Sequence, residues 1–514
     1  MLEGLPRFRF RVPPWQHQGL ALRRSWDQTA FALYMEQGTG KTKVIIDTAG
    51  LLYLRGQIAA LLVVAPDGVQ RAWVRDELPK HMSPAVAYQA AVWVNQPTRK
   101  QQRQIDALYD NRFSGLRVLA VNYETLATRT GAAGALKFLR TFEALMVADE
   151  SHRIKNVKAE RAAIMHKLGP RAKYRRILTG TPVATSPLDV YSQFLFLDES
   201  ILGYQSWVAF RAHYAVLEES DSHLMRHIVQ RLEAKFGKAR AAKMAPQLIA
   251  RDPATGRPLY RNMDELIERL KPHSFRVLKS ECLDLPPKVY QRRYVSLSPE
   301  QRRIYNQLRD EFIAEYAGML MATPLVITRL TRLQQITGGF FKPHADAETI
   351  PIAGKNPKVK SLLDACAQAS GKVLIWARFK AELELIAAKL EEEEEYGAGS
   401  VARYWSGHAR DSAKAKFMNE PRCRFFVAQP KAGGTGLDGL QIADTVIYYS
   451  NEFALIDRLQ SEDRAHRGGS ERHASVTIID IEAEDTLDTK IIDALRSKKD
   501  LADAITGDPP RNWL

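Results

Sequence analysis

The sequence GTGKT at Gly38–Thr42 closely follows the apolar run Phe31–Tyr34 and opens an apolar helical stretch. In such a turn, at the N-terminus of a helix, backbone N–H groups form a cradle for phosphate. A lysine at this spacing reaches the outer phosphates, and the neighbouring threonine hydroxyl can bind Mg²⁺. The stretch therefore predicts a strand, a nucleotide-binding loop and a helix. The residues predicted to bind the nucleotide here are Gly38, Thr39, Gly40, Lys41 and Thr42.

Short apolar runs alternate with longer helical stretches on both sides of this loop. In the first half of the chain the runs are Phe31–Tyr34, Leu61–Val64, Val118–Val121, Leu145–Ala148 and Arg176–Leu178. In the second half they are Lys372–Trp376, Phe425–Ala428, Thr445–Tyr449 and Val476–Asp480. Strands that alternate with helices form a parallel sheet covered on both faces. The sequence therefore predicts an α/β protein with two lobes.

The region between the two lobes is mostly helical and charged. Pro286 and Pro287 are the best candidate for a hinge, because proline restricts both itself and the residue before it to extended geometry. We predict lobe 1 at residues 1–200, a helical insertion attached to it at 201–285, an interlobe linker with a helical protrusion at 286–355, and lobe 2 at 356–514.

The composition is that of an ordinary globular chain with excess positive charge. Lys and Arg number 74 against 59 Asp and Glu, a formal net charge of +15, which favours a polyanionic partner. No apolar run approaches the about 20 residues that cross a bilayer. The first residues lack the basic-then-apolar layout of a secretory signal. We therefore expect no membrane partner. We expect the protein to lie in the cytosol, either of a prokaryote or of a cell that hosts a virus.

An acidic pair follows the predicted strand Leu145–Ala148. Asp149 and Glu150 stand at its carboxyl end, where a parallel sheet faces the crevice that binds ligands. Asp149 can hold Mg²⁺ through the water shell of the ion. Glu150 can orient or deprotonate an attacking water. Together with Lys41, this pair predicts an enzyme that hydrolyses a nucleoside triphosphate.

Two arginines in the second half can complete such a site. Arg464 and Arg467 are three residues apart and would share one face of a helix. Phosphoryl transfer needs positive charge opposite the developing negative charge, and an arginine finger supplies it. The first lobe has no obvious finger and the second has no phosphate loop. One active site built between the lobes resolves both deficits.

Taken in order, these motifs resemble the Swi/Snf-type DNA translocases of helicase superfamily two, over most of the chain. The string at Pro14–Gln16 resembles the adenine-reading element of that family, with Gln16 in its glutamine position. Val64–Pro66, with Trp73 and Glu77 downstream, resembles its first nucleic-acid-contacting motif. The acidic motif continues into RIKN at Arg153–Asn156, which is typical of the Swi/Snf branch.

The resemblance continues through the second half. Leu178–Pro182 matches the motif that couples hydrolysis to lobe motion, and Leu285–Lys288 begins the interlobe passage of the family. Lys431–Leu437 and the arginine pair complete lobe 2. The chain departs from the family at three places, which are Met35, Asp438–Gly439 and Ser470.

The resemblance implies two RecA-like lobes that use ATP and Mg²⁺. It implies catalytic roles for Lys41, Asp149, Glu150, Arg464 and Arg467, a metal site at Thr42 and Asp149, and further nucleotide contacts at Gln16 and Gly436. The implied coupling residues are His152, Thr179, Thr181 and Gln460. Basic residues in a cluster or near the motifs are candidate nucleic-acid contacts: Arg99, Lys100, Arg103, Lys155, Arg329, Arg332 and Lys431.

Three hypotheses about function remain open at this point. The first is an ATPase that translocates on double-stranded DNA and remodels it or displaces bound protein. The second is a true strand-separating helicase on branched DNA or RNA, with single-stranded nucleic acid as a partner. The third is a switch or scaffold subunit of a larger DNA-processing complex, which predicts a guanine-reading NKxD string that the sequence lacks. A protein partner would most plausibly dock on the insertion at residues 215–275.

Overall fold

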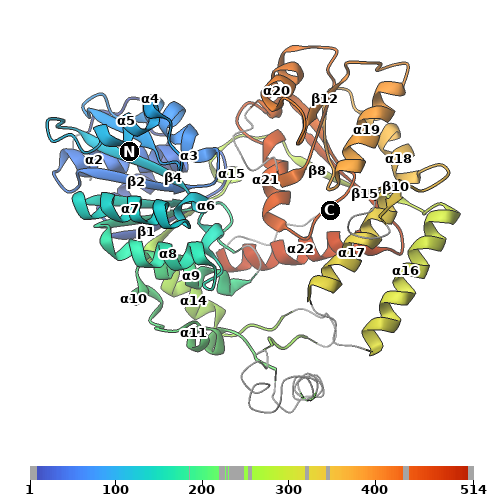
Figure 1. Ribbon diagram of the computed structural model, residues 1–514, viewed down its shortest axis with the longest axis horizontal. Helices are drawn as coiled ribbons and strands as arrows, with labels where there is room; N and C mark the ends of the chain where they lie inside the picture. Colours follow the sequence, from blue (N-terminus) through green and yellow to red (C-terminus); the bar gives the residue numbers. More distant parts are fainter. Residues whose placement is uncertain are drawn as a thin grey trace.

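The computed structural model describes residues 8–183, 186–218, 226, 230, 248–252, 258–318, 323–342, 348–431 and 439–506. Figure 1 shows two α/β lobes side by side, with α15 (Lys279–Cys282) and α21 (Leu455–Ala465) in the region between them. The predicted fold class, an α/β protein with two parallel-sheet lobes and helices inserted between them, is confirmed.

Lobe 1 contains a sheet of seven parallel strands in the order β3-β4-β2-β5-β6-β1-β7. The strands are β1 (Ala30–Met35), β2 (Ala60–Ala65), β3 (Tyr88–Val92), β4 (Leu116–Asn122), β5 (Ala144–Asp149), β6 (Tyr174–Leu178) and β7 (Ser274–Val277). Every residue of β1, β2 and β5 is buried. Such strands read as continuous apolar runs, because helices cover both faces of the sheet.

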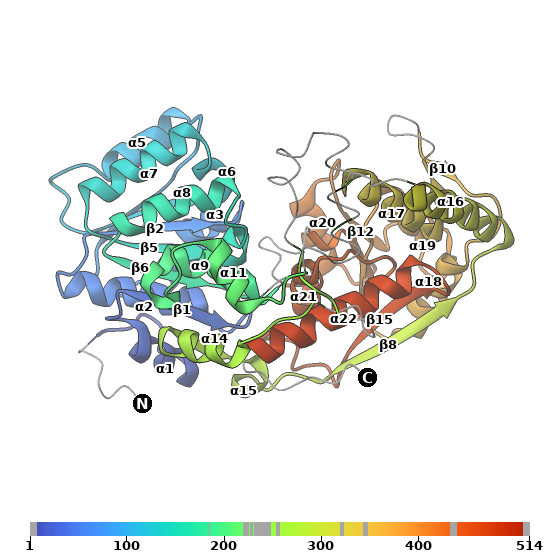
Figure 2. The ribbon, with the colours of Figure 1, turned by 90° about the horizontal axis from the view of Figure 1, so that it is seen from below.

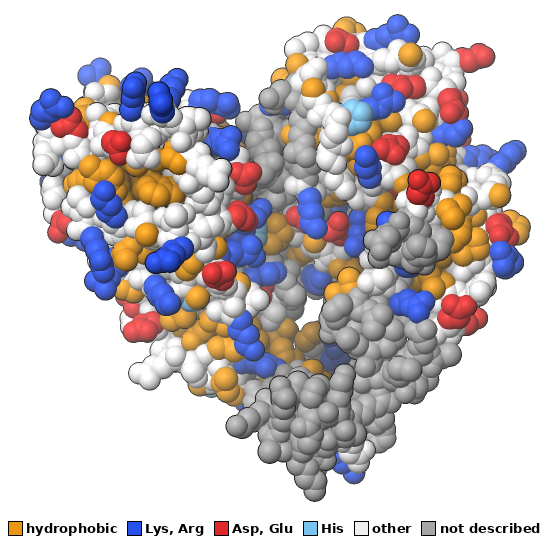
Figure 3. All heavy atoms as spheres, in the orientation of Figure 1, with side chains coloured by type: hydrophobic (Ala, Val, Ile, Leu, Met, Phe, Trp, Pro, Cys, Tyr) orange, Lys and Arg blue, Asp and Glu red, His pale blue; other side chains and the backbone are white. Residues whose placement is uncertain are grey.

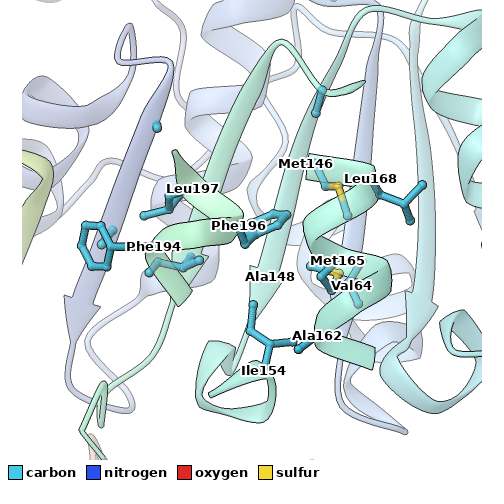
Figure 4. Close-up of a cluster of buried hydrophobic side chains, with 14 of the residues drawn as sticks. Val64, Met146, Ala148, Ile154, Ala162, Met165, Leu168, Phe194, Phe196 and Leu197 are labelled. Atoms are coloured by element: carbon cyan, nitrogen blue, oxygen red, sulfur yellow. The ribbon is translucent and has the colours of Figure 1, made fainter. Parts of the chain in front are cut away.

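Two helical layers enclose this sheet. One contains α1 (Gln16–Ser25), α2 (Lys41–Leu54), α3 (Val69–Ala72), a π-helical turn at Trp73–Glu77 and α4 (Leu78–His81). The other contains α5 (Arg99–Ala107), α6 (Tyr123–Leu126), α7 (Arg129–Thr141), α8 (Glu160–Leu168) and α9 (Val190–Leu197). Figure 4 shows part of the second layer, where Met165 of α8 and Phe196 of α9 pack over Val64 and Met146 of the sheet.

Shorter elements complete lobe 1. The helices α10 (Glu199–Leu202), α11 (Trp207–Tyr214) and α14 (Met263–Leu270) lie between β6 and β7 in the chain. Short 3₁₀ turns occur at Ser151–Ile154, Gly169–Arg171, Pro187–Asp189 and Lys271–His273.

Lobe 2 contains a sheet of six parallel strands in the order β12-β13-β11-β14-β15-β8. The strands are β8 (Lys288–Val295), β11 (Lys372–Trp376), β12 (Val401–Tyr404), β13 (Phe425–Ala428), β14 (Ala443–Tyr448) and β15 (Val476–Ala483). Its helices α18 (Pro357–Gln368) and α19 (Lys380–Glu392) cover one face, and α20 (Arg410–Asn419) and α21 cover the other. A 3₁₀ turn at Leu440–Ile442 precedes β14.

A helical pair and a C-terminal helix extend from lobe 2. The pair consists of α16 (Pro299–Gly318) and α17 (Thr323–Gly338), followed by the antiparallel strands β9 (Phe340–Phe341) and β10 (Ile350–Pro351). The last helix, α22 (Leu487–Thr506), runs from lobe 2 to the side of α14 of lobe 1 (Figure 2).

All nine predicted strands are present, and the structure moves two of the predicted boundaries. The region assigned to a helical insertion, 201–285, includes β7, which pairs with β1 as the edge of the first sheet. The region assigned to the linker, 286–355, includes β8, which pairs with β15 as the edge of the second sheet. Pro286 and Pro287 lie between these two edge strands, so the connection between the sheets is much shorter than predicted.

Candidate nucleotide site between the lobes

The loop between β1 and α2 has a conformation that only glycine adopts easily. Gly38 and Gly40 have φ angles of 86° and 90°, in the left-handed region. A Cβ atom on Gly40 would lie 2.2 Å from Nε2 of Gln18. The loop leads directly into the first turn of α2, which begins at Lys41 and contains Thr42. The predicted phosphate cradle is therefore built as a glycine turn at a helix N-terminus, which fits a phosphate group.

The ammonium group of Lys41 points back into this loop. Its Nζ donates to the carbonyl oxygens of Met35 at 2.8 Å and Glu36 at 3.2 Å. These oxygens keep a buried ammonium satisfied and lie where β1 ends. Met35, where the sequence departs from the family, has its side chain wholly within the core. It therefore contributes to the site through its backbone oxygen.

Helix α1 supports the loop from behind. Nε2 of His17 and Nε2 of Gln18 donate to the carbonyl of Thr39 at 2.8 and 3.1 Å. Gln16, the predicted adenine contact, is exposed and lines an open pocket of about 870 Å³ together with Trp15 and residues of β7 and α15. The supporting roles of His17 and Gln18 were not predicted from the sequence.

The carboxylate of Asp149 is held by a buried tryptophan. Nε1 of Trp73 donates to Oδ2 of Asp149 at 2.8 Å, and the hydroxyl of Tyr123 donates to the Asp149 backbone carbonyl at 2.8 Å. Burial raises the pKa of Asp149 to about 6, the charge of Glu150 adds to the rise, and the Trp73 hydrogen bond opposes it. Trp73 was grouped with a nucleic-acid-contacting motif, but its side chain is only 1% exposed. It contacts the acidic site instead.

Glu150 is connected to the coupling motif through His152. Its backbone is in the left-handed region with φ 52°, and its Oε2 lies 3.3 Å from Nδ1 of His152. The same His152 nitrogen lies 3.4 Å from Oγ1 of Thr179, which accepts from the backbone N–H of Thr181 at 3.0 Å. Burial raises the pKa of Glu150, but the His152 hydrogen bond and nearby positive charges hold it below its ordinary value. Glu150 is thus a carboxylate at neutral pH.

A second link between these motifs was missed in the sequence. Oε1 of Gln193, on α9, accepts from Oγ of Ser151 at 2.7 Å, and its Nε2 donates to the carbonyl of Pro182 at 2.8 Å. Gln193 is fully buried. The available signal was a glutamine in a mostly apolar helix that covers the sheet, and this signal does not reveal a partner.

The arginine motif of lobe 2 lies against the phosphate loop of lobe 1. Cβ of Arg467 is 3.9 Å from the position that a Cβ on Gly38 would take. Arg464 is buried in the last turn of α21, which ends at Ala465. Arg467 therefore lies beyond the helix, and the prediction that the two arginines share one helical face is wrong. Gln460 of α21 lines a cavity of about 320 Å³ together with Glu150 and Thr181 of lobe 1. The structure therefore brings predicted residues from both lobes to one interlobe site.

The other end of α21 faces the acidic motif. Burial and the charge of Glu452 raise the pKa of Asp457, whereas the charges of Lys431, His152 and Arg153 oppose the rise. Charges of lobe 1 thus act on Asp457 near the start of α21, and Arg467, just beyond the end of the helix, lies at the phosphate loop.

The oxygen donors predicted for magnesium, Thr42 and Asp149, lie at the ends of two elements of lobe 1. Among the residues that the structure describes, no group of three or more His, Cys, Asp or Glu side chains could hold a metal ion. Mg²⁺ keeps several waters and takes one or two carboxylates plus substrate phosphates. Thr42 in the first turn of α2 and Asp149 at the end of β5 fit this requirement.

Comparison with known families decides the assignment. The model of the SNF2-related domain matches residues 15–338, and that of the helicase conserved C-terminal domain matches residues 354–469. The chain belongs to the SNF2-related family. This membership confirms the predicted assignment to helicase superfamily two, and it agrees with the two RecA-like lobes that were predicted.

The relatives of this SNF2 chain are larger proteins. YwqA of Bacillus subtilis is 25% identical over 524 residues, covering 99% of this chain and 50% of the relative. The DNA annealing helicase and endonuclease ZRANB3 of Mus musculus is 27% identical over 501 residues, covering 95% of this chain and 40% of the relative. A solved Sulfolobus solfataricus SWI2/SNF2 ATPase core in complex with dsDNA is 20% identical with a TM-score of 0.40, covering 98% of this chain and 96% of that one. The chain spans half or less of these two curated relatives.

The predicted nucleic-acid contacts of the SNF2 chain lie on several elements. Arg99, Lys100 and Arg103 are exposed on α5. Lys155 lies 3.9 Å from Asp189, and the largely exposed Lys431 lies 3.4 Å from Glu452. Arg329 and Arg332 are partly exposed on α17. Lys and Arg side chains gather on the upper rim of lobe 1, beside the notch that separates the lobes in Figure 3.

Two further observations complete the account of the SNF2 chain. Gly436 and most of the insertion at 215–275 lie outside the described residues, so their predicted roles stay predictions. No described helix has the length and apolar character needed to span a bilayer.

Proposed function

We propose that this protein hydrolyses ATP between its two lobes and uses the cycle to translocate on double-stranded DNA, which it remodels or clears of bound protein. The observation that carries the proposal is the position of Arg467, whose Cβ lies 3.9 Å from where a Cβ on Gly38 would be, because the arginine motif of one lobe then lies beside the phosphate loop of the other. Neither lobe by itself contains both the phosphate loop and the arginine motif.

Each predicted residue has a role that its surroundings allow. Lys41 and the glycine loop bind the phosphates of ATP, after Lys41 leaves the carbonyls of Met35 and Glu36. Thr42 and Asp149 would hold Mg²⁺, which supplies positive charge to the phosphates when bound. Glu150 orients or deprotonates the attacking water, and Arg464 and Arg467 stabilise the charge that develops on the transferred phosphoryl group.

The hydrogen bonds around Glu150 provide a route from hydrolysis to lobe motion. A change at Glu150 reaches Thr179 through His152, and Gln193 ties Ser151 of the same motif to Pro182. Thr181 of lobe 1 and Gln460 of lobe 2 both line the interlobe cavity. Closing on ATP and opening after hydrolysis would thus change the spacing of the lobes on a bound strand.

Charge and relationship support duplex DNA as the substrate. The net charge of +15 favours a polyanion, and exposed Arg99, Lys100 and Arg103 offer phosphate contacts, as do Lys155 and Lys431. The name of the ZRANB3 relative refers to DNA. In a prokaryote such a motor would work in the cytosol, where its DNA lies.

ATP turnover measured side by side without nucleic acid and with duplex DNA, single-stranded DNA and RNA tests the substrate. We expect duplex DNA to stimulate turnover most, with no strand separation in a displacement assay. Strongest stimulation by RNA, or efficient unwinding, would favour a true helicase. Slow turnover that no nucleic acid stimulates would favour a switch or scaffold.

The two-lobe site is tested by Arg467→Ala. Because an arginine finger contributes about 10³–10⁵ in rate, we expect DNA-stimulated turnover to be abolished while ATP still binds. Arg472→Ala, which removes an exposed arginine five positions further along, is the matched control and should keep its activity. Near-wild-type turnover of Arg467→Ala would refute the site.

A further inference from the structure

The end of α21, which carries Arg464 and is followed by Arg467, is held by the short segment between the sheets. Oδ1 of Asp463 lies 2.7 Å from Nζ of Lys279, which also donates to the carbonyl of His466 at 3.0 Å. Nε2 of His466 in turn donates to the carbonyl of Pro286 at 2.9 Å. Asp463 and His466 alternate in sequence with Arg464 and Arg467. Whatever holds Asp463 and His466 therefore also sets the position of the arginines.

Lys279 belongs to lobe 1 and touches the phosphate loop as well. It is the first residue of α15, directly after the edge of the first sheet, and its backbone N–H donates to Oε2 of Glu36 at 2.6 Å. Its Cε atom is 3.9 Å from the position that a Cβ on Gly38 would take. One residue thus contacts the loop that binds phosphate and the motif that must face it.

The surroundings of Lys279 make this contact costly to lose. The side chain is 5% exposed and that of Asp463 is 20% exposed. Burial lowers the pKa of Lys279, and the charge of Asp463 opposes that fall. Lys288, at the start of β8, approaches the same Asp463 oxygen at 3.8 Å and Oε2 of Glu462 at 3.0 Å. Removing one partner of a buried pair leaves the other charge uncompensated.

We propose that Lys279 is a positioning residue for the arginine motif, which seats the end of α21 on the phosphate loop so that Arg464 and Arg467 face the substrate. The proposal rests on the proposed hydrolysis of ATP at this site. Lys279 acts through Asp463 and the His466 carbonyl. Its role is to fix the closed arrangement of the lobes, whereas Lys41 and the phosphate loop determine the affinity for ATP.

The test compares Lys279→Met with Lys279→Arg and Asp463→Asn. A misplacement of about 1 Å at a reacting centre costs about 10²-fold in rate, so we expect kcat of Lys279→Met to fall by about that factor. KM and ATP binding should change by less than about threefold, since the ground-state contacts of the loop remain. Asp463→Asn should lower kcat similarly, the double variant should be no worse than either single one, and Lys279→Arg should restore much of the activity.

Lys271→Met is the matched control. This lysine lies just before β7 and also forms an ion pair, with Glu268 at 3.3 Å, but both side chains are 70% exposed. Its kcat should equal that of the wild type. A loss in Lys279→Met of less than about threefold, additive losses in the double variant, or a loss of ATP binding equal to the loss of kcat would each overturn the positioning role.

A measurement without turnover separates this proposal from the proposed function. Small-angle X-ray scattering of the nucleotide-free proteins should give a larger radius of gyration for Lys279→Met than for wild type and Lys271→Met, because the lobes are released. Melting curves check that the variants are folded. If the wild type does not hydrolyse ATP, the proposed function fails, while an unchanged radius in Lys279→Met refutes the seating of α21.

Discussion

Single side chains set the chemistry of the candidate site. The carboxylate of Asp149 stands at the end of a fully buried strand, where burial and the charge of Glu150 raise its pKa to about 6. Metal binding requires the ionised form, so binding weakens as the pH falls through this value. The indole N–H of Trp73 favours the carboxylate and thereby holds its pKa down.

The first prediction concerns this hydrogen bond. Trp73→Phe removes a donor to a charged acceptor, a contact worth about 1.5–3 kcal/mol. The pKa of Asp149 should rise further above 6, so the acid limb of the pH profile of kcat/KM should move to higher pH. The pH dependence of ATP turnover at fixed magnesium measures the shift.

Trp405→Phe is the control for this substitution. Trp405 is also 1% exposed, but it lies in the core of lobe 2. It should lose stability without moving the acid limb. An unchanged acid limb in Trp73→Phe would show that Asp149 does not set it.

The second prediction concerns the left-handed glycine of the phosphate loop. Gly40→Ala adds a Cβ that meets Gln18 at 2.2 Å, at a φ of 90°. Either the Gln18 amide, which donates to the Thr39 carbonyl, or the loop itself must then shift. The loop loses this support in both cases, and we expect ATP binding to be lost. Gly399→Ala is the control, because Gly399 has a φ of 92° and nothing within 4 Å of the added Cβ. Both variants carry a backbone strain of about 1–2 kcal/mol, but ATP titration should show lost binding only for Gly40→Ala.

At the scale of elements, a buried ion pair fixes the start of α22 on lobe 2. Nζ of Lys358, on α18, lies 2.8 Å from Oδ2 of Asp488, and their side chains are 1% and 5% exposed. Oγ1 of Thr337, on α17, donates to the other carboxylate oxygen at 3.0 Å. One carboxylate therefore joins three helices, and α22 then crosses to lobe 1.

The third prediction concerns the stability of lobe 2. Asp488→Asn keeps the shape of the side chain but leaves Lys358 buried without its counter-ion, which costs about 3–5 kcal/mol. Urea unfolding should show the loss as a lower midpoint. The exposed pair of Lys389 and Glu392 is the control, since their side chains are 42% and 59% exposed. Glu392→Gln should cost about 0–1 kcal/mol, and an equal loss in both variants would contradict the argument.

The same scale explains what the sequence could and could not predict. Central strands such as β1 and β5 are buried on both faces, so they appear as apolar runs and were predicted. The edge strands β7 and β8 are less buried and contain arginine. In β7 buried positions alternate with partly buried ones, and β8 has no fully buried position. Their apolar pattern is too weak to distinguish from a loop, and both were missed.

Because β7 was not predicted, part of the candidate site was not predicted either. The motifs at Lys41, Asp149 and Arg467 are local strings, so their chemistry is visible in the sequence. Lys279 acquires its role only because β7 pairs with β1 and carries the chain to the phosphate loop. A contact that depends on the pairing of residues 32–35 with residues 274–277 has no local signal.

At the scale of the whole molecule, the distribution of positive charge indicates which side of lobe 1 would contact DNA. Helix α5 follows the carboxyl end of β3 in the chain. In parallel α/β folds, ligands bind at the side of the sheet where the carboxyl ends of the strands lie. Arg99 and Arg103 are exposed on this helix. The loop that follows α5 lies at the opposite side, where the amino ends of the strands lie, because it leads into the start of β4.

The last prediction is therefore that the affinity for mixed-sequence duplex DNA falls steeply with salt, by a slope of about −0.9 in log K against log salt for each neutralised phosphate. Fluorescence anisotropy at several salt concentrations measures the slope. If Arg99 and Arg103 contact phosphates, replacing both with alanine should reduce the slope by about 2. Arg112→Ala removes an arginine whose side chain is 90% exposed at the opposite side of the sheet, and it should leave the slope unchanged. Equal effects at the two sides would mean that net charge alone attracts DNA, and an affinity independent of salt would exclude phosphate contacts as its source.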